Sequence, residues 1–340
     1  MDKNKWLRVG VGILLLFLVG VFLRLARPIL VPFALALLFG FAVSPVLDFL
    51  VRRKVPKALA LVLILIVSFA VLYLIGMVFY SGGKALAAEL PSYTEMVKAF
   101  LENIDAMVPD PRLKVGLADW VQGLNVGRIG AILIGALGPF LSFMSDLLLV
   151  FVFMTFILAG RGRLIRKIDE AFPPGQASAW SRTVVRIDCR VQRYLAVKTL
   201  INLLIGILVA AVLAVFGVRF AVLFGVLAVL FNYIPTLGPL ASVVLPTLMS
   251  LFLEGGFNVK VAVILVLLVG IHVALLRLLE RRLMGEELSL SPLLVLFSLF
   301  FWAWLWGVPG MILAVPLLAA ARILFEHVPS LRFLATMMDR

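Results

Sequence analysis

The chain has 340 residues, of which 64% are apolar and 14% charged, and its mean hydropathy is +1.16. A soluble protein carries about 25% charged residues, so this composition excludes a soluble fold and predicts an apolar surface that faces lipid. The formal net charge is +13. Because the basic residues lie in short connectors between apolar runs, we read them as membrane-topology signals and expect no nucleic-acid partner.

Apolar runs divide the chain into eight segments. Two of these runs, residues 220–253 and 290–325, are too long for one span and are interrupted by glycine and proline. We therefore expect an all-α integral membrane protein with about six full transmembrane helices plus two broken or re-entrant hairpins. The expected full spans are residues 9–23, 29–51, 58–80, 139–160, 195–217 and 259–279.

The connectors predict the domain organisation. Arginine and lysine concentrate in the N-terminal tail, after the second span and after the fourth, which places these parts and both termini in the cytoplasm. The predicted parts are three transmembrane helices (1–81), an extracytoplasmic amphipathic helical insert (82–138), a fourth transmembrane helix (139–160), a basic cytoplasmic amphipathic linker (161–198), a transmembrane core with both broken hairpins (199–328) and a cytoplasmic tail (329–340).

The outer insert contains a helix-start signal. Ser92 followed by Glu95 forms a capping-box pattern, and apolar residues then recur at helical spacing. The same periodicity suits either a cover packed on the outer membrane face or a gate over a substrate vestibule.

The basic linker contains an amphipathic helix at residues 179–195. Its apolar face holds Trp180, Val184, Ile187, Val191 and Tyr194. Another face holds Arg182, Arg186, Arg190 and Arg193. Such a helix suits contact with anionic lipid headgroups, and the alternative is an electropositive funnel for an anionic solute.

An internal repeat links the two broken runs. With a shift of seventy positions, FNYIPTLGPLASVVLPTL at 231–248 aligns with FWAWLWGVPGMILAVPLL at 301–318, and Pro239 falls on Pro309. A re-entrant reading of both runs also keeps the Arg281–Arg282 cluster in the cytoplasm. Inverted repeats with broken helices are typical of secondary transporters, whose ligands bind at the breaks. The breaks therefore predict a solute-binding region.

Polar, aromatic and backbone-exposing residues at the breaks are the candidate ligands, because polar groups inside a membrane are costly. The predicted substrate-binding residues are Asn202, Asn232, Tyr233, Pro235, Gly238, Pro239, Trp306, Gly307, Pro309 and Gly310. His272 lies deep in its span and is the candidate for proton or ion coupling. Helix–helix hydrogen bonding by the asparagines and a neutral packed imidazole are the structural alternatives.

Several chemistries are not expected. Cys189 is the single cysteine and the chain has two histidines, so neither a disulfide within the chain nor a zinc site is expected. The run SGGKAL at 81–86 lacks the spacing of a phosphate-binding loop. We therefore expect no enzyme, no cofactor and no metal.

The chain resembles the autoinducer-2 exporter family of bacterial membrane proteins over about residues 8–330. The resemblance depends on RPILVPFALALLFGFAVSPVLDFL, on FNYIPTLGPL at 231–240 and on MGEELSLSPLLVLFSLFFWAWLWGVPGMILAVPL at 284–317. Thr236 stands where the family motif has an aromatic residue. The resemblance implies about eight transmembrane helices, a multi-pass protein of the bacterial cytoplasmic (inner) membrane and a homo-oligomer.

Two transport hypotheses and one from another class follow. The protein exports a small polar solute, such as the quorum-sensing signal autoinducer-2 that the resemblance implies, or it exchanges Na⁺ or Li⁺ for protons. The scarcity of carboxylates deep in the spans favours the solute exporter. The third hypothesis is a non-transporting membrane scaffold or regulator, which leaves the paired helix breaks unexplained. The expected partners are a small-molecule or ion substrate and membrane lipid.

Overall fold

The computed structural model describes residues 3–107, 147–160, 173–284, 291–327 and 332–338, together with positions 167, 170 and 171. Within these ranges the secondary structure is helical and contains no strand, which confirms the all-α membrane class. The chain divides into two compact units. Unit 1 comprises Met1–Leu65, Asp146–Ala196 and Met284–Arg340, and unit 2 comprises Ile66–Ser145 and Val197–Leu283.

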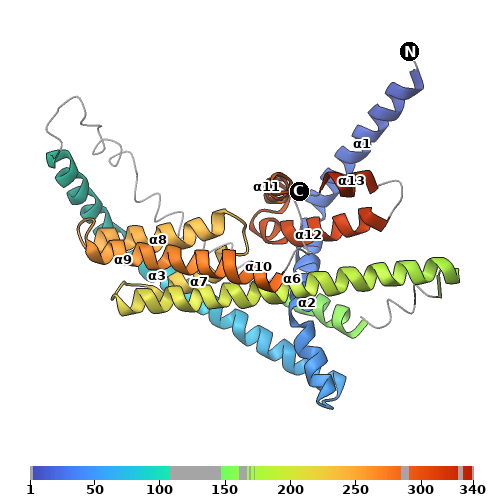
Figure 1. Cartoon of the computed structure of the whole chain (residues 1–340), viewed down its shortest axis with the longest axis horizontal. Helices are drawn as coiled ribbons and strands as arrows, with labels where there is room; N and C mark the ends of the chain where they lie inside the picture. The colour runs from blue at the N-terminus through green and yellow to red at the C-terminus, as the bar shows by residue number, and fades with distance from the viewer. Residues whose placement is uncertain are drawn as a thin grey trace. The chain divides into compact units, whose positions relative to one another are not determined.

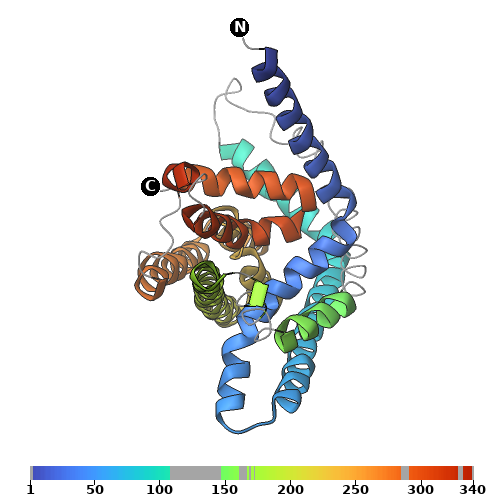
Figure 2. The same ribbon diagram turned by 90° about the vertical axis from the view of Figure 1, so that its right-hand side faces the viewer.

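Unit 1 contains the N-terminal and C-terminal helices (Figures 1 and 2). Helix α1 (Lys3–Leu25) precedes α2 (Arg27–Arg52), and α11 (Pro292–Trp306) packs on α12 (Val308–His327), which also contacts α13 (Arg332–Met337). The helix Leu147–Gly160 packs against α2 through an edge-to-face contact of Phe33 and Phe153, with 5.5 Å between ring centroids. Apolar side chains hold these helices together and leave much apolar surface exposed for lipid.

Unit 2 contains five consecutive helical elements and most of α3 (Lys57–Met107). Helix α7 (Ala221–Phe231) is followed by α8 (Leu237–Leu253), then α9 (Val259–His272), the π-helix η1 (Val273–Leu279) and the short α10 (Glu280–Met284) (Figure 1). Their core also includes the last part of α6 (Pro174–Val215). Its buried members are Ile201, Ile205, Val209, Leu213, Val218, Phe224, Ala228, Val243, Met249, Ile264 and Leu268.

Both long apolar runs are broken at the positions where glycine and proline predict a helix break. In the first run, α7 ends at Phe231 and α8 begins at Leu237. In the second run, Gly307 separates the end of α11 from the start of α12. Each break brings two helix ends into backbone contact. A side chain on Gly238 would collide with the carbonyl oxygen of Phe231, and one on Gly310 with that of Trp302. Each broken run is therefore a helix–break–helix unit in which a glycine early in the second helix lies against a carbonyl oxygen near the end of the first.

The helix lengths differ from the expected spans. In the described part of the chain, five helices have the length and apolar character needed to cross a membrane, at Arg27–Arg52, Lys57–Leu86, Val184–Val215, Val259–Leu279 and Val308–Glu326. The last lies in the second broken run, because Gly307 divides that run unequally and leaves α12 with 20 residues. The first expected span is a shorter apolar helix at Gly10–Leu25. Residues 139–146 of the fourth lie outside the described residues.

Two predicted boundaries fall inside continuous helices. Helix α3 (Lys57–Met107) runs through Ser92, so no new helix starts there, and α6 joins the basic linker to the following span without a break. Helix α3 continues past Pro91, although proline inside a helix removes a backbone hydrogen bond and usually bends or ends it. The outer insert beyond Met107 lies outside the described residues.

Candidate functional site

Buried polar side chains gather in unit 2 at the break between α7 and α8. Asn232 ends α7, Ser242 lies in the second turn of α8, and His272 ends α9. All three side chains are buried, with exposed fractions of 5% or less. Asn232 stops α7 because an asparagine at a helix end competes for backbone hydrogen bonds, and Pro235 prevents immediate continuation. The break thus positions an amide among apolar helices.

Hydrogen bonds orient this cluster. The Asn232 side-chain Nδ2 donates to the Ala228 carbonyl oxygen at 2.6 Å and to Ser242 Oγ at 3.2 Å. It also lies 3.4 Å from His272 Nε2. His272 Nδ1 lies 2.8 Å from the Leu268 carbonyl oxygen, which only accepts, so Nδ1 carries the proton. In a neutral ring Nε2 is then an acceptor that faces the Asn232 amide.

Three buried amide atoms lack a partner among the described residues. They are the side-chain Nδ2 and Oδ1 of Asn202 and the Oδ1 of Asn232. An unpaired buried polar atom costs about 1–3 kcal/mol of folding free energy, and Asn202 is 0% exposed. A polar molecule that entered here would find a donor and two acceptors.

The crossing of α6 and α7 places Asn202 near the break. Thr199 Oγ1 and the Tyr233 hydroxyl are 2.8 Å apart, and further along, side chains on Gly206 and Gly225 would each collide with the other's backbone. The two helices therefore run antiparallel in close contact. By this register Asn202 lies level with the last turn of α7, which ends at Phe231 and is followed by Asn232.

Backbone groups at the breaks make local hydrogen bonds. The N–H groups of Ile234 and Gly238 donate to the Phe231 and Ile234 carbonyls, at 2.7 and 3.1 Å. In the second break the Gly307 N–H donates to the Ala303 carbonyl and the Met311 N–H to the Gly307 carbonyl. These backbone groups are therefore paired within the breaks.

The predicted residues fall into two groups. Asn202, Asn232, Tyr233, Pro235, Gly238, Pro239 and His272 lie in unit 2, and Trp306, Gly307, Pro309 and Gly310 lie in unit 1. Trp306 has a local role, since its indole Nε1 donates to the Leu23 carbonyl oxygen at 3.1 Å in the last turn of α1. Its ring centroid lies 4.6 Å from that of Trp302. The buried polar cluster therefore lies at the first break, in unit 2.

The basic face of the linker helix lies in the first half of α6. Arg182, Arg186 and Arg193 are exposed and Arg190 is half-buried, whereas Val191 on the apolar face is buried. This distribution fits an amphipathic helix. Contact of the arginines with lipid stays a prediction.

Unit 2 also contains an ion pair that the sequence did not predict. Lys198 Nζ lies 3.0 Å from Glu280 Oε1, and their side chains are 11% and 18% exposed. Both residues stand at span ends, but 82 positions separate them, so no local pattern pairs them. Lys198 immediately precedes Thr199, the partner of Tyr233.

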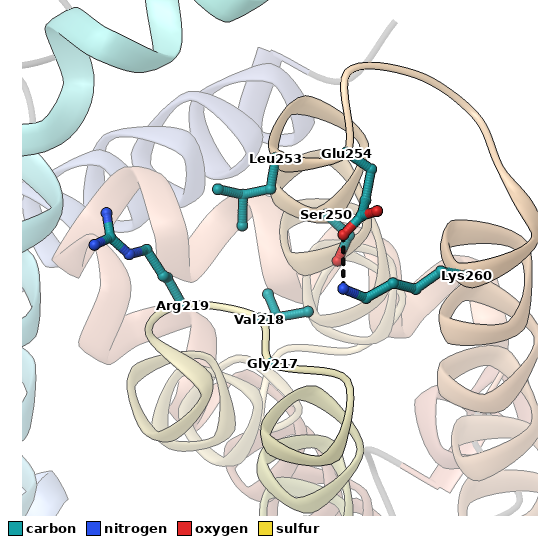
Figure 3. Close-up of a pocket in the computed structure, with 7 residues that line it drawn as sticks. All are labelled: Gly217, Val218, Arg219, Ser250, Leu253, Glu254 and Lys260. Carbon is teal, nitrogen blue, oxygen red and sulfur yellow. Dashed lines mark hydrogen bonds and ion pairs between the residues drawn. The ribbon is translucent and has the colours of Figure 1, made fainter.

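A small pocket lies where α6, α7, α8 and α9 end or begin. Its volume is about 270 Å³, and it is lined by Gly217, Val218, Arg219, Ser250, Leu253, Glu254 and Lys260 (Figure 3). Lys260 Nζ lies 2.6 Å from Glu254 Oε1. Hydrogen bonds from Lys260 and then Asn258 hold the pKa of Glu254 below the ordinary glutamate value. The carboxylate is therefore ionised at neutral pH.

The fold and the buried cluster define the class: a polytopic α-helical membrane protein with unpaired polar groups beside a broken helix, as in secondary transporters. Comparison with known proteins narrows this class. The profile of the AI-2E family transporters matches residues 11–330, and the chain belongs to this family. The resemblance seen in the sequence is thereby confirmed, and the family's function is membrane transport.

Three relatives span nearly the whole chain. The AI-2 transport protein TqsA of Escherichia coli strain K12 is 29% identical over 97% of this chain and 94% of its own. A protein of Borreliella burgdorferi named "Putative transport protein" is 29% identical over 94% of this chain and 87% of its own. A protein of Haemophilus influenzae with the same name is 27% identical over 95% of this chain and 92% of its own.

Proposed function

We propose that this protein is a secondary transporter that exports a small, uncharged polar solute, of the kind represented by autoinducer-2. The observation that supports this proposal is the set of unpaired amide atoms of Asn202 and Asn232, buried beside the break between α7 and α8. One amide donor and two acceptors match a solute with hydroxyl and carbonyl groups. The name of the E. coli relative TqsA supports the choice of solute class.

The charge of the cluster also favours an uncharged solute. Lys198 and Glu280 neutralise each other in an ion pair, and the atoms left without a partner belong to neutral amides. A charged solute would leave its own charge uncompensated in this apolar unit, at a cost of several kcal/mol.

Substitutions of the two asparagines distinguish this proposal from a purely structural role of the cluster. Replacing Asn202 by leucine removes two unpaired polar atoms at similar volume, so we expect thermal stability in detergent to stay equal or rise, by about 1–3 kcal/mol. Transport should fall by about tenfold, the equivalent of one hydrogen bond to the solute. Asn232→Ala should also lower transport.

The assay is uptake of a labelled furanone autoinducer-2 into inside-out membrane vesicles that contain the protein. Ser44→Ala is the matched control, because Ser44 is a buried serine that donates to the Gly40 carbonyl of its own helix, outside the cluster. Unchanged transport in both asparagine variants would remove the cluster from the site. Loss of stability in Asn202→Leu would indicate a structural hydrogen bond instead.

A cation/proton antiporter is the second candidate, and the contact of His272 with Asn232 is the observation that favours it. Purified protein in liposomes with a pH-sensitive dye distinguishes the two. A saturable, protein-dependent pH change on addition of Na⁺ or Li⁺, absent in His272→Gln, would establish the antiporter. No change with inserted, folded protein supports the solute exporter.

A further inference from the structure

Helix α8 carries a stripe of small and polar residues on one face. Positions four apart lie on the same side of a helix, and the stripe consists of Gly238, Ser242, Pro246, Ser250 and Glu254, the last at the end of the helix. Its first four members are all buried in unit 2. The opposite face carries large apolar residues, of which Val244 is 39% and Leu248 41% exposed. The polar face of α8 is therefore turned inward.

The two serines of the stripe present acceptors to the interior of the unit. Ser242 Oγ donates to the Gly238 carbonyl oxygen at 2.8 Å, and Ser250 Oγ donates to the Pro246 carbonyl oxygen at 3.0 Å. Each hydroxyl proton is thus used within α8, which leaves oxygen lone pairs for another donor. Ser242 accepts from the Asn232 amide.

The stripe runs between two polar sites of unit 2, the amide cluster and the pocket. One end meets Asn232, whose Oδ1 is buried and unpaired. The other end, at Ser250 and Glu254, lines the pocket of about 270 Å³ (Figure 3). The sixteen helical steps from Gly238 to Glu254 extend over about 24 Å at the rise of an α-helix, which is most of the thickness of a membrane interior.

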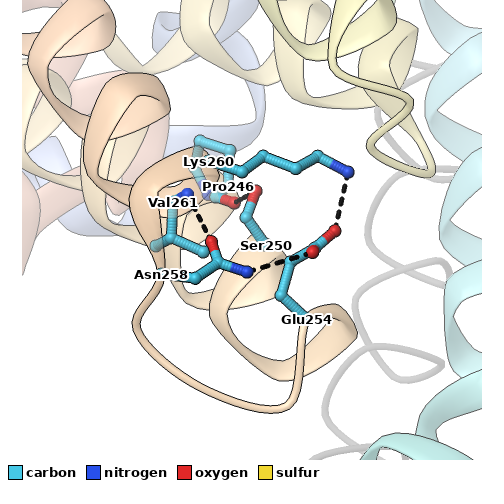
Figure 4. A network of polar contacts seen from close by, with 6 residues as sticks. All are labelled: Pro246, Ser250, Glu254, Asn258, Lys260 and Val261. Atoms are coloured by element: carbon cyan, nitrogen blue, oxygen red, sulfur yellow. Dashed lines mark hydrogen bonds and ion pairs between the residues drawn. The ribbon is translucent and has the colours of Figure 1, made fainter.

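Charges at the pocket occur in pairs. Figure 4 shows Lys260 beside Glu254, and Asn258 Nδ2 donating to Glu254 Oε2 at 3.1 Å. Arg219 Nη1 lies 2.8 Å from Glu89 Oε2. A charged solute would have to compete with one of these pairs, whereas an uncharged one can bond to ammonium, carboxylate and Ser250 without separating them. The pocket therefore favours uncharged solutes.

We propose that the inward face of α8 is the path of the solute between the amide cluster and the pocket, and that the pocket is a second binding site for a small, uncharged solute with hydroxyl or carbonyl groups. This inference rests on the proposed function and deepens it. In the present structure Ser242 and Ser250 are buried, so the path is closed between its two ends and opens during transport.

Single cysteines on α8 test the path without knowledge of the solute. In a Cys189→Ser background, which removes the one native thiol, Ser242→Cys and Ser250→Cys lie on the stripe, and Val244→Cys and Leu248→Cys are the controls on the opposite face. Each variant is reconstituted in liposomes and treated with methanethiosulfonate reagents, which react with a thiolate in contact with water. We expect both stripe positions to react at least about tenfold faster than both controls.

A charge comparison tests the pocket. Cationic and anionic methanethiosulfonates should label Ser250→Cys at similar rates, because the surrounding charges are paired. Adding Glu254→Gln leaves Lys260 unpaired and should favour the anionic reagent by about tenfold. A strong preference for one sign before that change would contradict a site for uncharged solutes.

Several outcomes would overturn the path. If Ser242→Cys reacts as slowly as the controls, the pocket does not connect to the amide cluster. If all four positions react at equal rates, α8 has no solute path on its inward face. Thermal unfolding of each variant in detergent confirms that only folded protein is compared. If the stripe is accessible while Asn202→Leu and Asn232→Ala transport normally, the path stands and the proposed amide site fails.

Discussion

At the scale of single residues, the cluster around Asn232 combines satisfied and unsatisfied polar groups. The Asn232 amide nitrogen bonds within unit 2, whereas its oxygen and both polar atoms of Asn202 have no partner among the described residues. A cluster that served only stability would pair all of its atoms, because each unpaired one is costly. We infer that these asparagines are present for ligand binding.

The ion pair of Lys198 and Glu280 leads to a prediction at the same scale. Glu280→Gln or Lys198→Met alone leaves a largely buried charge without its partner, and should lower the free energy of unfolding by about 3 kcal/mol. The double variant should recover much of this loss, since no isolated charge remains. Thermal unfolding in detergent measures all three.

The exposed pair of Lys260 and Glu254 provides the control, because its side chains are 38% and 28% exposed and water screens their attraction. Lys260→Met should therefore change stability much less than Lys198→Met. Equal effects at the two pairs, or additive effects in the Lys198–Glu280 double variant, would contradict a coupled buried pair.

At the scale of helices, glycine sets how closely elements approach. A side chain on Gly225 would lie 2.7 Å from the Gly206 carbonyl oxygen, and one on Gly206 would lie 2.6 Å from the Gly225 carbonyl oxygen. This contact brings α6 and α7 together at the backbone, as small residues do in membrane helices. It places Asn202 beside the broken hairpin.

Gly225→Ala tests this packing. The added methyl group meets the backbone of α6, so we expect a loss of about 1–3 kcal/mol in unfolding free energy and lower transport. Gly270→Ala in α9 is the matched control, because nothing lies within 4 Å of the added carbon and alanine favours a helix by about 0.5–1 kcal/mol. Equal stability of the two variants would show that α6 and α7 do not depend on close contact.

At the scale of the whole molecule, the question is whether the first broken run crosses the membrane or returns to the side from which it entered. Helices α7 and α8 have 11 and 17 residues and pack against each other, which is consistent with a hairpin that returns to its own side. With such a hairpin, the positive-inside rule predicts that the α8–α9 connection lies outside the cytoplasm.

A cysteine at Glu254 tests this orientation. In the Cys189→Ser background, Glu254→Cys should react with an impermeant maleimide applied to intact cells, and Arg282→Cys only after the cells are opened. The control is the unmodified background, which should not be labelled. Labelling of Glu254→Cys exclusively from the cytoplasmic side would contradict the re-entrant hairpin.

The sequence by itself determined the membrane class, the all-α fold and the position of both helix breaks. These features are local, because hydropathy needs only composition over about twenty residues and a break needs only glycine and proline at a turn. It also identified Asn202, Asn232 and His272 as unusual, since polar residues within apolar runs are visible without a structure. Membership of the AI-2E family agrees with this reading.

Tertiary structure decided which of these residues meet. Asn232, Ser242 and His272 lie on three helices, and Lys198 pairs with Glu280 across 82 positions. It also gave Trp306 a local bond to α1 and joined the basic linker to a span in α6. Such contacts depend on how helices pack around one another, which local patterns do not encode. The amide cluster, the inward stripe of α8 and the pocket at its end are consequences of that packing.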